Sequence, residues 1–322
     1  MPYRLAFFRD AAPGGGLRRG LDHCMNRFVS PKELATSIGA SESSLKRWVD
    51  NGHLEVTRTA GGHRRIPINE AVRFIRDRGL HLVRPDVLGL APSLDLTQEA
   101  HLELPMGKRL SRLLIEGRMQ EARGLIMALF MEGMTVAEIA DGPIATAFEE
   151  IGELWHHSET GIIIEHRATE AIIYAINVIR PLLEVDPAET SLTAIGCSLS
   201  GDPYILPPLL AAVSILELGF RSIALGPDLP FRVLANEVKR LRPELIWLST
   251  SLVPDPKGVS AMLAELGEEV ASWGGLIVLG GREAHLLDYP ESPAIQSCSS
   301  MQGLVEVAGW IDRTRRSDDT AA

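Results

Sequence analysis

Three residues near the middle of the chain combine side chains that suit a flat, metal-bearing ligand. Trp155 is followed, after nine intervening residues, by the pair Glu165 and His166. A tryptophan offers a flat aromatic face, a carboxylate accepts hydrogen bonds from hydroxyl groups, and an imidazole binds metal ions. Taken alone, a Trp near a helix end usually belongs to a core, and a Glu-His pair usually faces solvent. The spacing of these three residues therefore indicates a binding site only when it is considered together with the elements around it.

A second group of candidate residues is basic and lies in the first 80 positions. That segment holds 14 Lys and Arg against 8 Asp and Glu, a charge of +6, within a chain whose net charge is −10. Basic residues neutralise nucleic-acid phosphates, and a glycine turn lets the tip of a hairpin approach a phosphate backbone closely. A basic head on an acidic body predicts that only the head meets a polyanion.

The elements that position the basic residues can be predicted locally. Ser30 is placed to cap a first helix, with Pro31 in its first turn and Glu33 near its positive end. After a turn at Gly39, Ser41 caps a second helix that carries Lys46 and Arg47. Two short strands then meet at a glycine pair, flanked by Arg58, His63, Arg64 and Arg65. This order predicts a winged helix-turn-helix that binds double-stranded DNA.

The remainder of the chain changes pattern twice. Residues 105–184 are amphipathic and helical, with one helix expected from Thr135 to Trp155 and another from Glu159 to Leu183, which predicts a four-helix bundle. From residue 190, short apolar runs alternate with helix-length segments, which is typical of a Rossmann-like (flavodoxin-like) parallel α/β domain.

The predicted fold class is thus an α plus α/β multidomain protein. Its expected segments are a disordered N-terminus (1–25), the DNA-binding domain (26–80), a linker (81–104), the bundle (105–186), the α/β domain (187–315) and a disordered tail (316–322).

The basic head resembles the MerR superfamily, especially its short BldC-like or excisionase-like branch. The segment that carries the resemblance is SPKELATSIGASESSLKRWVDNGHLEVTRTAGGHRRI (30–66). The resemblance implies that Ser43, Ser44, Lys46 and Arg47 face the major groove, while Arg58, His63, Arg64 and Arg65 form a wing on the flanking backbone or minor groove. The alternative is a solvated basic hairpin without a partner.

The helical region resembles a second family. The Trp155 to Glu165-His166 spacing is similar to the W-x9-EH motif of CarH/LitR-type photoreceptor regulators. The resemblance implies that these residues cover the upper face of adenosylcobalamin. It also implies that His156 is a cobalt ligand once light removes the adenosyl group.

The α/β region resembles the cobalamin-binding fold of methionine synthase and CarH. ELGFRSIALGPDLPFRVL (217–234) is similar to the second strand and the following loop, and Ser249, Gly280 and Gly281 match the elements that bury the cofactor's nucleotide tail. The D-x-H-x-x-G loop departs from the pattern. Asp202 is present, but Tyr204 stands where the cobalt-ligating histidine would be, and a proline replaces the glycine. Tyrosine is a poor cobalt ligand near neutral pH because its phenol keeps its proton.

Three interpretations of the sensory region follow. It binds cobalamin without the lower histidine; it binds a linear tetrapyrrole such as biliverdin, with Cys197 as the thiol anchor; or it is an empty, degenerate fold that serves oligomerisation or partner binding. For Cys197 the ordinary alternative is a small apolar strand residue.

The overall expectation is a cytoplasmic, ligand- or light-responsive transcriptional regulator that forms a homo-oligomer, a dimer or a tetramer. No apolar run is long enough for a membrane helix, and three widely spaced cysteines do not form a disulfide framework. The rival class is a corrinoid methyltransferase-type protein, but such a protein needs the cobalt histidine. No nucleophile, base and orienting group can be recognised, so we expect no enzyme.

Overall fold

The computed structural model describes residues 28–58, 62–90, 104–155, 159–184, 192–289 and 292–321. The chain divides into two compact units, which are described separately. The N-terminal unit comprises Met1–Phe74 with Leu82–Leu90, and the C-terminal unit comprises Ile75–His81 with Ala91–Ala322. Among the described helices, none combines the length and the apolarity that a bilayer crossing needs.

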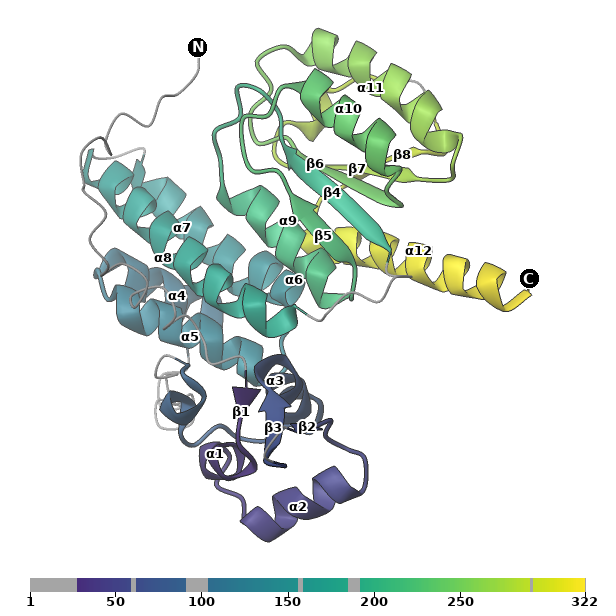
Figure 1. Ribbon diagram of the computed structural model, residues 1–322. Coiled ribbons are helices and arrows are strands. Elements are labelled where there is room, and N and C mark those ends of the chain that lie inside the picture. Colours follow the sequence, from purple (N-terminus) through teal and green to yellow (C-terminus); the bar gives the residue numbers. More distant parts are fainter. Residues whose placement is uncertain are drawn as a thin grey trace, which may run out of the picture. The chain divides into compact units, whose positions relative to one another are not determined.

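The N-terminal unit contains two short helices, a small antiparallel sheet and part of a third helix (Figure 1). Its elements are α1 (Pro31–Ser37), α2 (Glu42–Asp50), β1 (Phe28–Val29), β2 (Thr57–Arg58), β3 (Arg64–Pro67) and α3 (Ile68–Asp77), with the sheet order β1-β3-β2. Both expected helix starts are present. The Ser30 hydroxyl accepts a hydrogen bond from the Glu33 N–H (3.2 Å), and the Ser41 hydroxyl accepts one from the Ser44 N–H (3.1 Å). These caps satisfy amide donors that a helix start leaves unpaired.

Residues 82–90 correct the expected linker of 81–104. The N–H groups of Val83 and Arg84 both donate to the Ser37 carbonyl at the end of α1, at 2.8 and 3.0 Å. A 3-10 helix, η2 (Pro85–Leu88), follows, and Leu88 and Leu90 are buried. A segment without helical periodicity therefore belongs to the N-terminal unit, because its leucines complete a core that two short helices leave open. The rest of the expected linker, residues 91–103, lies outside the described residues.

Helices α4 (Met106–Ile115), α5 (Met119–Met131), α6 (Val136–Ile139), α7 (Ala145–Trp155) and α8 (Glu159–Leu183) form the helical region. The single helix expected from Thr135 to Trp155 is interrupted by a π-helical turn, η3 (Ala140–Ile144), which contains Pro143. Proline has no N–H to donate, so the regular i→i−4 ladder cannot continue through it. Helix α8 has the expected bounds.

The α/β region is a five-stranded parallel sheet of order β5-β4-β6-β7-β8 (Figure 1). Its strands are β4 (Thr193–Ser198), β5 (Arg221–Ala224), β6 (Leu245–Ser249), β7 (Leu276–Gly280) and β8 (Ile295–Cys298). Helices α10 (Phe231–Leu241) and α11 (Pro256–Ala271) pack on one face, and α9 (Leu206–Glu217) and α12 (Met301–Ala321) on the other. The predicted helical region followed by a parallel, Rossmann-like α/β sheet is confirmed.

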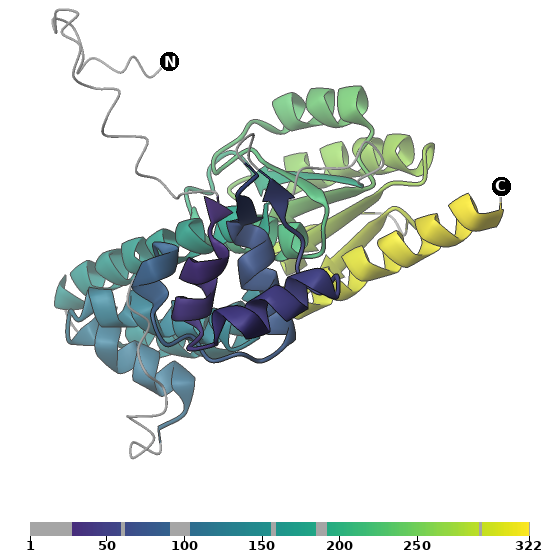
Figure 2. The ribbon, with the colours of Figure 1, turned by 60° about the horizontal axis from the view of Figure 1, so that its bottom comes forward.

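The C-terminal tail is a second correction. Residues 316–322 were expected to be disordered, but helix α12 continues to Ala321, as Figure 2 shows. The segment after Trp310 contains neither glycine nor proline, so nothing in it stops a helix that has already started.

Gly196 provides a test of how tightly the sheet is packed. A Cβ atom at this position of β4 would overlap the carbonyl and the indole ring of Trp247 on the neighbouring strand. We therefore predict that Gly196→Ala lowers the free energy of unfolding by about 1–3 kcal/mol, as overpacked cores do. The matched control is Gly152→Ala within α7, where an added Cβ meets nothing within 4 Å. Helix propensity predicts that this change stabilises the protein by up to about 1 kcal/mol. Urea unfolding midpoints measure both, and equal midpoints for the two variants would contradict the packing.

Candidate functional site

The carboxyl edge of the sheet is the natural place for a ligand. Strands β4 and β6 are neighbours, and the chain leaves β4 toward α9 on one face and leaves β6 toward α11 on the other. In open α/β sheets, ligands bind in the crevice where the connections diverge in this way. The loops after β4, β6 and β7 therefore form the candidate site.

Asp202 holds two of these loops together. Its Oδ2 accepts hydrogen bonds from the N–H groups of Ser251 (2.7 Å) and Leu252 (3.3 Å), and its Oδ1 accepts one from the Tyr204 N–H (3.1 Å). The residue is fully buried. Burial raises the pKa of its carboxyl group, and the three backbone donors oppose that shift. Asp202 is thus a structural link between the loops after β4 and β6.

Tyr204 follows in the same loop and is 43% exposed. Its carbonyl accepts a hydrogen bond from the Ser198 hydroxyl (3.3 Å), which fixes the backbone and leaves the phenol outside. Helix α9 starts two residues later, with a proline in its first turn. Proline is favourable there because the first helical amides have no partner within the helix. The loop therefore presents the phenol of Tyr204 at the position where the resembled family has the imidazole of a histidine.

A cavity of about 170 Å³ lies beside this loop. An apolar cavity of roughly 150 Å³ can hold a benzene ring, so the space suits the end of an aromatic ring system. The indole Nε1 of Trp247, a lining residue, is buried without a hydrogen-bond partner among the described residues. The cavity is lined by Asp141, Pro207, Ala211, Trp247, Leu248, Ser249, Val278, Gly280, Gly281, Cys298, Ser299, Ser300, Met301 and Leu304.

Two glycines shape the rim of the cavity. Gly281 has a φ of +120°, and a Cβ atom there would lie 2.7 Å from the backbone carbon of Thr250. Thr250 in turn donates to the Gly280 carbonyl through both its N–H (2.8 Å) and its hydroxyl (3.0 Å). The ends of β6 and β7 are therefore held too close for a side chain at Gly281. Ser249, Gly280 and Gly281 were predicted site residues; Thr250 and Trp247 were not, because both look like ordinary strand residues.

Glu165 and His166 lie on α8, in the helical region. The Thr169 hydroxyl donates to Glu165 Oε1 (3.0 Å), and Glu165 Oε2 lies 3.5 Å from His166 Nδ1. The His166 side chain is 75% exposed and that of Glu165 is 27% exposed. Neither side chain lines the cavity. The side chain of Trp155 and the whole of His156 lie outside the described residues.

Cys197 is a correction to the thiol-anchor hypothesis. It is fully buried, and burial raises the pKa of its thiol to about 12. Side chains alternate along a strand, and Cys197 packs with Ile195 into the core under α10 and α11, whereas the cavity opens on the α9 and α12 face. A thiol that is protonated and turned away from the cavity is a poor nucleophile for attaching a ligand there.

The predicted DNA-contacting residues lie on α2 and on the β2–β3 hairpin. Ser43, Lys46 and Arg47 are exposed, while Ser44 is half-buried and its hydroxyl hydrogen-bonds with that of Ser41. On the hairpin, Arg58 and His63 are exposed and Arg64 and Arg65 are half-buried. Arg64 forms an ion pair of 3.1 Å with Asp50 at the end of α2, which the sequence did not indicate. This pair joins the β2–β3 hairpin to α2, so the basic residues of the two elements are linked within the N-terminal unit.

Comparison with known proteins finds a similarity within the C-terminal unit. Residues 106–180 match the family described as "B12 binding domain". The trimethylamine corrinoid protein of Methanosarcina barkeri is 27% identical over 141 residues, 42% of this chain and 64% of that protein. Trimethylamine corrinoid protein 1 of Methanosarcina acetivorans is 23% identical over 140 residues, 42% of this chain and 65% of that protein. The chain thus spans slightly less than two thirds of the length of these relatives.

A solved structure agrees with the fold. The monomethylamine corrinoid protein of Methanosarcina barkeri superposes with a TM-score of 0.50 at 18% identity, over 63% of this chain and 96% of that chain. The helical region followed by a parallel α/β sheet is therefore the fold of that corrinoid protein. The B12-binding match begins at residue 106, after the N-terminal unit.

The burial of Cys197 makes a prediction about its reactivity. With a pKa of about 12, roughly one thiol in ten thousand is ionised at pH 8, and only the thiolate reacts with alkylating agents. We predict that iodoacetamide modifies Cys197 in the native protein far more slowly than after denaturation, and that the native rate rises with pH up to about 12 unless the protein unfolds first. Site-resolved mass spectrometry gives both rates. Modification of native Cys197 at the rate of a free thiol would contradict its position in the core.

Proposed function

We propose that this protein regulates transcription by binding double-stranded DNA through its N-terminal unit and a corrinoid, in the form of cobalamin, through its C-terminal unit. The observation that carries the corrinoid part is the cavity rimmed by Ser249, Gly280 and Gly281 at the carboxyl edge of the sheet. It lies in a chain whose residues 106–180 match a B12 binding domain.

The DNA-binding part of the proposal is supported by the N-terminal unit. Two capped helices separated by a turn at Gly39, followed by an antiparallel hairpin, suit a winged helix-turn-helix. Lys46, Arg47 and Arg58 are exposed and carry the charge that phosphate contacts require. Because a unit of this size recognises few base pairs, we expect a homo-oligomer to present two or more such units to one operator.

The residues around the cavity fit the tail of cobalamin better than they fit its metal. The aromatic base of the tail would enter the cavity, with the glycines allowing close approach and Ser249 offering a hydroxyl. Trp155, Glu165 and His166 would contact the bound corrinoid, with His156 as a candidate cobalt ligand. When bound, the corrinoid supplies cobalt with an exchangeable upper ligand. The loop after β4 offers a phenol, and within the described residues no group of three or more His, Cys, Asp or Glu side chains could hold a metal ion.

A role as a corrinoid carrier in methyl transfer is the second candidate function. It is favoured by the names of the relatives, which are corrinoid proteins. Tyr204 argues against it, because a phenol is a weak substitute for imidazole on cobalt. Methyl transfer also gives no reason for a basic N-terminal unit, so we propose a regulator rather than an enzyme. A linear tetrapyrrole is not proposed, because buried Cys197 offers it no anchor.

The DNA-binding proposal predicts a change in salt dependence. Replacing Lys46 and Arg47 with glutamine removes two exposed charges from α2. We expect weaker binding to all DNA sequences and a slope of log affinity against log salt that is shallower by about 0.9 for each phosphate that the two side chains neutralise. Fluorescence anisotropy with duplex DNA at several salt concentrations measures this slope. The matched control replaces Lys108 and Lys257, two exposed lysines of the C-terminal unit, with glutamine. If both double variants behave like the unmodified protein, α2 is not the DNA-binding element.

The corrinoid proposal predicts that filling the cavity abolishes binding. The nearest atoms to an added Cβ at Gly280 are 3.5 Å away, which is ordinary van der Waals contact, and Gly280 lines the cavity, so we expect Gly280→Val to narrow it. We expect hydroxocobalamin affinity to fall at least about tenfold, which corresponds to roughly 1.4 kcal/mol. Gly309→Val on α12 is the control.

Tyr204→His should have the opposite effect, with tighter binding and a spectrum of nitrogen-ligated cobalt. Absorption titrations distinguish these results, and unchanged affinity in Gly280→Val would refute the assignment of the cavity.

A further inference from the structure

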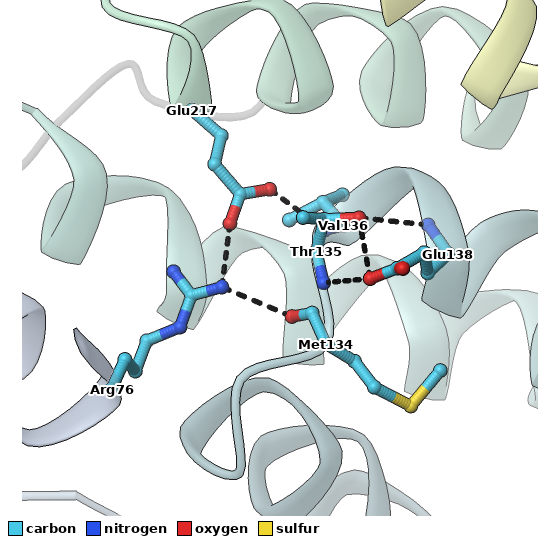
Figure 3. Close-up of polar contacts among 6 residues, drawn as sticks. All are labelled: Arg76, Met134, Thr135, Val136, Glu138 and Glu217. Carbon is cyan, nitrogen blue, oxygen red and sulfur yellow. Dashed lines mark hydrogen bonds and ion pairs between the residues drawn. The ribbon is translucent and has the colours of Figure 1, made fainter. Parts of the chain in front are cut away.

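A largely buried ion pair joins two helices that are far apart in the sequence. Arg76 Nη2 in the last turn of α3 donates to Glu217 Oε1 at the end of α9, at 2.7 Å (Figure 3). The two side chains are 14% and 12% exposed. Breaking a buried pair by removing one partner leaves an uncompensated charge, so this contact constrains both helices far more than a surface ion pair would.

Each partner also contacts the start of helix α6. Glu217 Oε2 accepts a hydrogen bond from the Val136 N–H, the first amide of α6, at 2.8 Å. Arg76 Nη2 donates to the Met134 carbonyl at 3.1 Å, and its guanidinium lies 3.9 Å from the centre of the Phe130 ring. Figure 3 shows Glu217 reaching both Arg76 and Val136. We call Arg76, Glu217 and Val136 the α3–α9 junction. It fixes the end of α3 to the helical region and to the α/β region at once.

Helix α3 belongs to both compact units. Its residues up to Phe74 lie in the N-terminal unit, and Ile75 onward lie in the C-terminal unit, although residues up to 80 were expected in the DNA-binding domain. Phe74 packs against Trp48 of α2, with 5.3 Å between ring centroids. One continuous helix therefore contributes Phe74 to the core of the N-terminal unit and Arg76 to the ion pair with Glu217.

Helix α9 links the junction to the cavity. Pro207 and Ala211, at its start and along its length, line the cavity, and Glu217 is its last residue. Twelve helical residues span about 18 Å at 1.5 Å per residue. Asp141 makes a second connection, since it lines the cavity and accepts hydrogen bonds from the N–H groups of Met301 and Gln302 at the start of α12, both at 2.8 Å. Helix α9 thus connects the cavity wall to the residue that pairs with Arg76.

We propose that occupancy of the cavity changes the restraint on helix α3 through α9 and the α3–α9 junction, so that Arg76 and Glu217 couple ligand binding to DNA binding. This inference rests on the proposed function for the identity of the two ligands. The contacts of the α3–α9 junction do not depend on that function. Coupling between two sites typically changes an affinity by roughly 5- to 150-fold. Neither residue needs to touch ligand or DNA; both act as positioning residues.

The test compares Glu217→Gln with the same substitution in a more exposed ion pair of the full-length chain. Glu269→Gln breaks the ion pair between Lys239 of α10 and Glu269 of α11, also 2.7 Å long, in the same unit but away from α3 and α9. Hydrogen exchange of α3 and of the Val136 amide is measured without ligand. We expect Glu217→Gln to accelerate exchange at both places by about fivefold or more, and Glu269→Gln to leave them unchanged. Equal protection of α3 in all three proteins overturns the proposal.

The second measurement is the ratio of DNA affinities with and without hydroxocobalamin. We expect a ratio of about fivefold or more in the unmodified chain and in Glu269→Gln, and a ratio near one in Glu217→Gln. An unchanged ratio in Glu217→Gln overturns the coupling. If the unmodified chain binds neither DNA nor hydroxocobalamin, the proposed function fails, and the exchange experiment alone decides the junction. Should Glu217→Gln not fold, Arg76→Met with Glu217→Met replaces the ion pair by an apolar pair and takes its place in both measurements.

Discussion

Three buried or half-buried carboxylates hold the C-terminal unit together by accepting hydrogen bonds from backbone amides of another segment. Asp202 joins the loops after β4 and β6, Asp141 caps α12 from the helical region, and Glu217 receives the first amide of α6. Hydrogen bonds with an ionised partner are roughly twice as strong as neutral ones. The amides at a helix start have no partner within the helix, so a carboxylate from elsewhere satisfies two requirements at once. The relation between helical region and sheet depends on these contacts.

The cavity depends on the same framework. Its walls come from α9, α12 and the ends of β6 and β7, and Asp202 and Thr250 fix the loops that surround it. An apolar space bounded by so many separate segments keeps its shape only if those segments are mutually fixed. The glycines at the rim are a consequence of this closeness, since the backbone at Thr250 leaves no room for a side chain at Gly281.

The loop after β4 combines a preserved framework with an altered chemical group. Asp202 keeps its three amide contacts, and Ser198 holds the Tyr204 carbonyl, so the backbone is fully specified. The exposed side chain on that backbone is a phenol. The backbone of the loop is held by main-chain hydrogen bonds, whereas the chemical group that it presents is a single side chain. That side chain can therefore change without a change in the backbone.

The sequence by itself determined the local features. The helix starts at Ser30, Ser41 and Thr135, the strands β4 to β7 and the long helix α8 were predictable, because caps and apolar periods involve residues within three or four positions of one another. Strand β8 was not predicted. Ser249, Gly280 and Gly281 were identified as site residues by resemblance, and the structure brings them together at one cavity.

Only the tertiary structure decided the rest. Residues 82–90 join a core because α1 offers them the Ser37 carbonyl, and Cys197 faces α10 and α11 because strand alternation in the assembled sheet puts it there. The partners Arg76 and Glu217 are separated by 141 positions, and nothing in either neighbourhood indicates the other. Contacts of that kind depend on how whole elements pack. A pattern read along the chain reports only which residues can be buried, and not what they will meet.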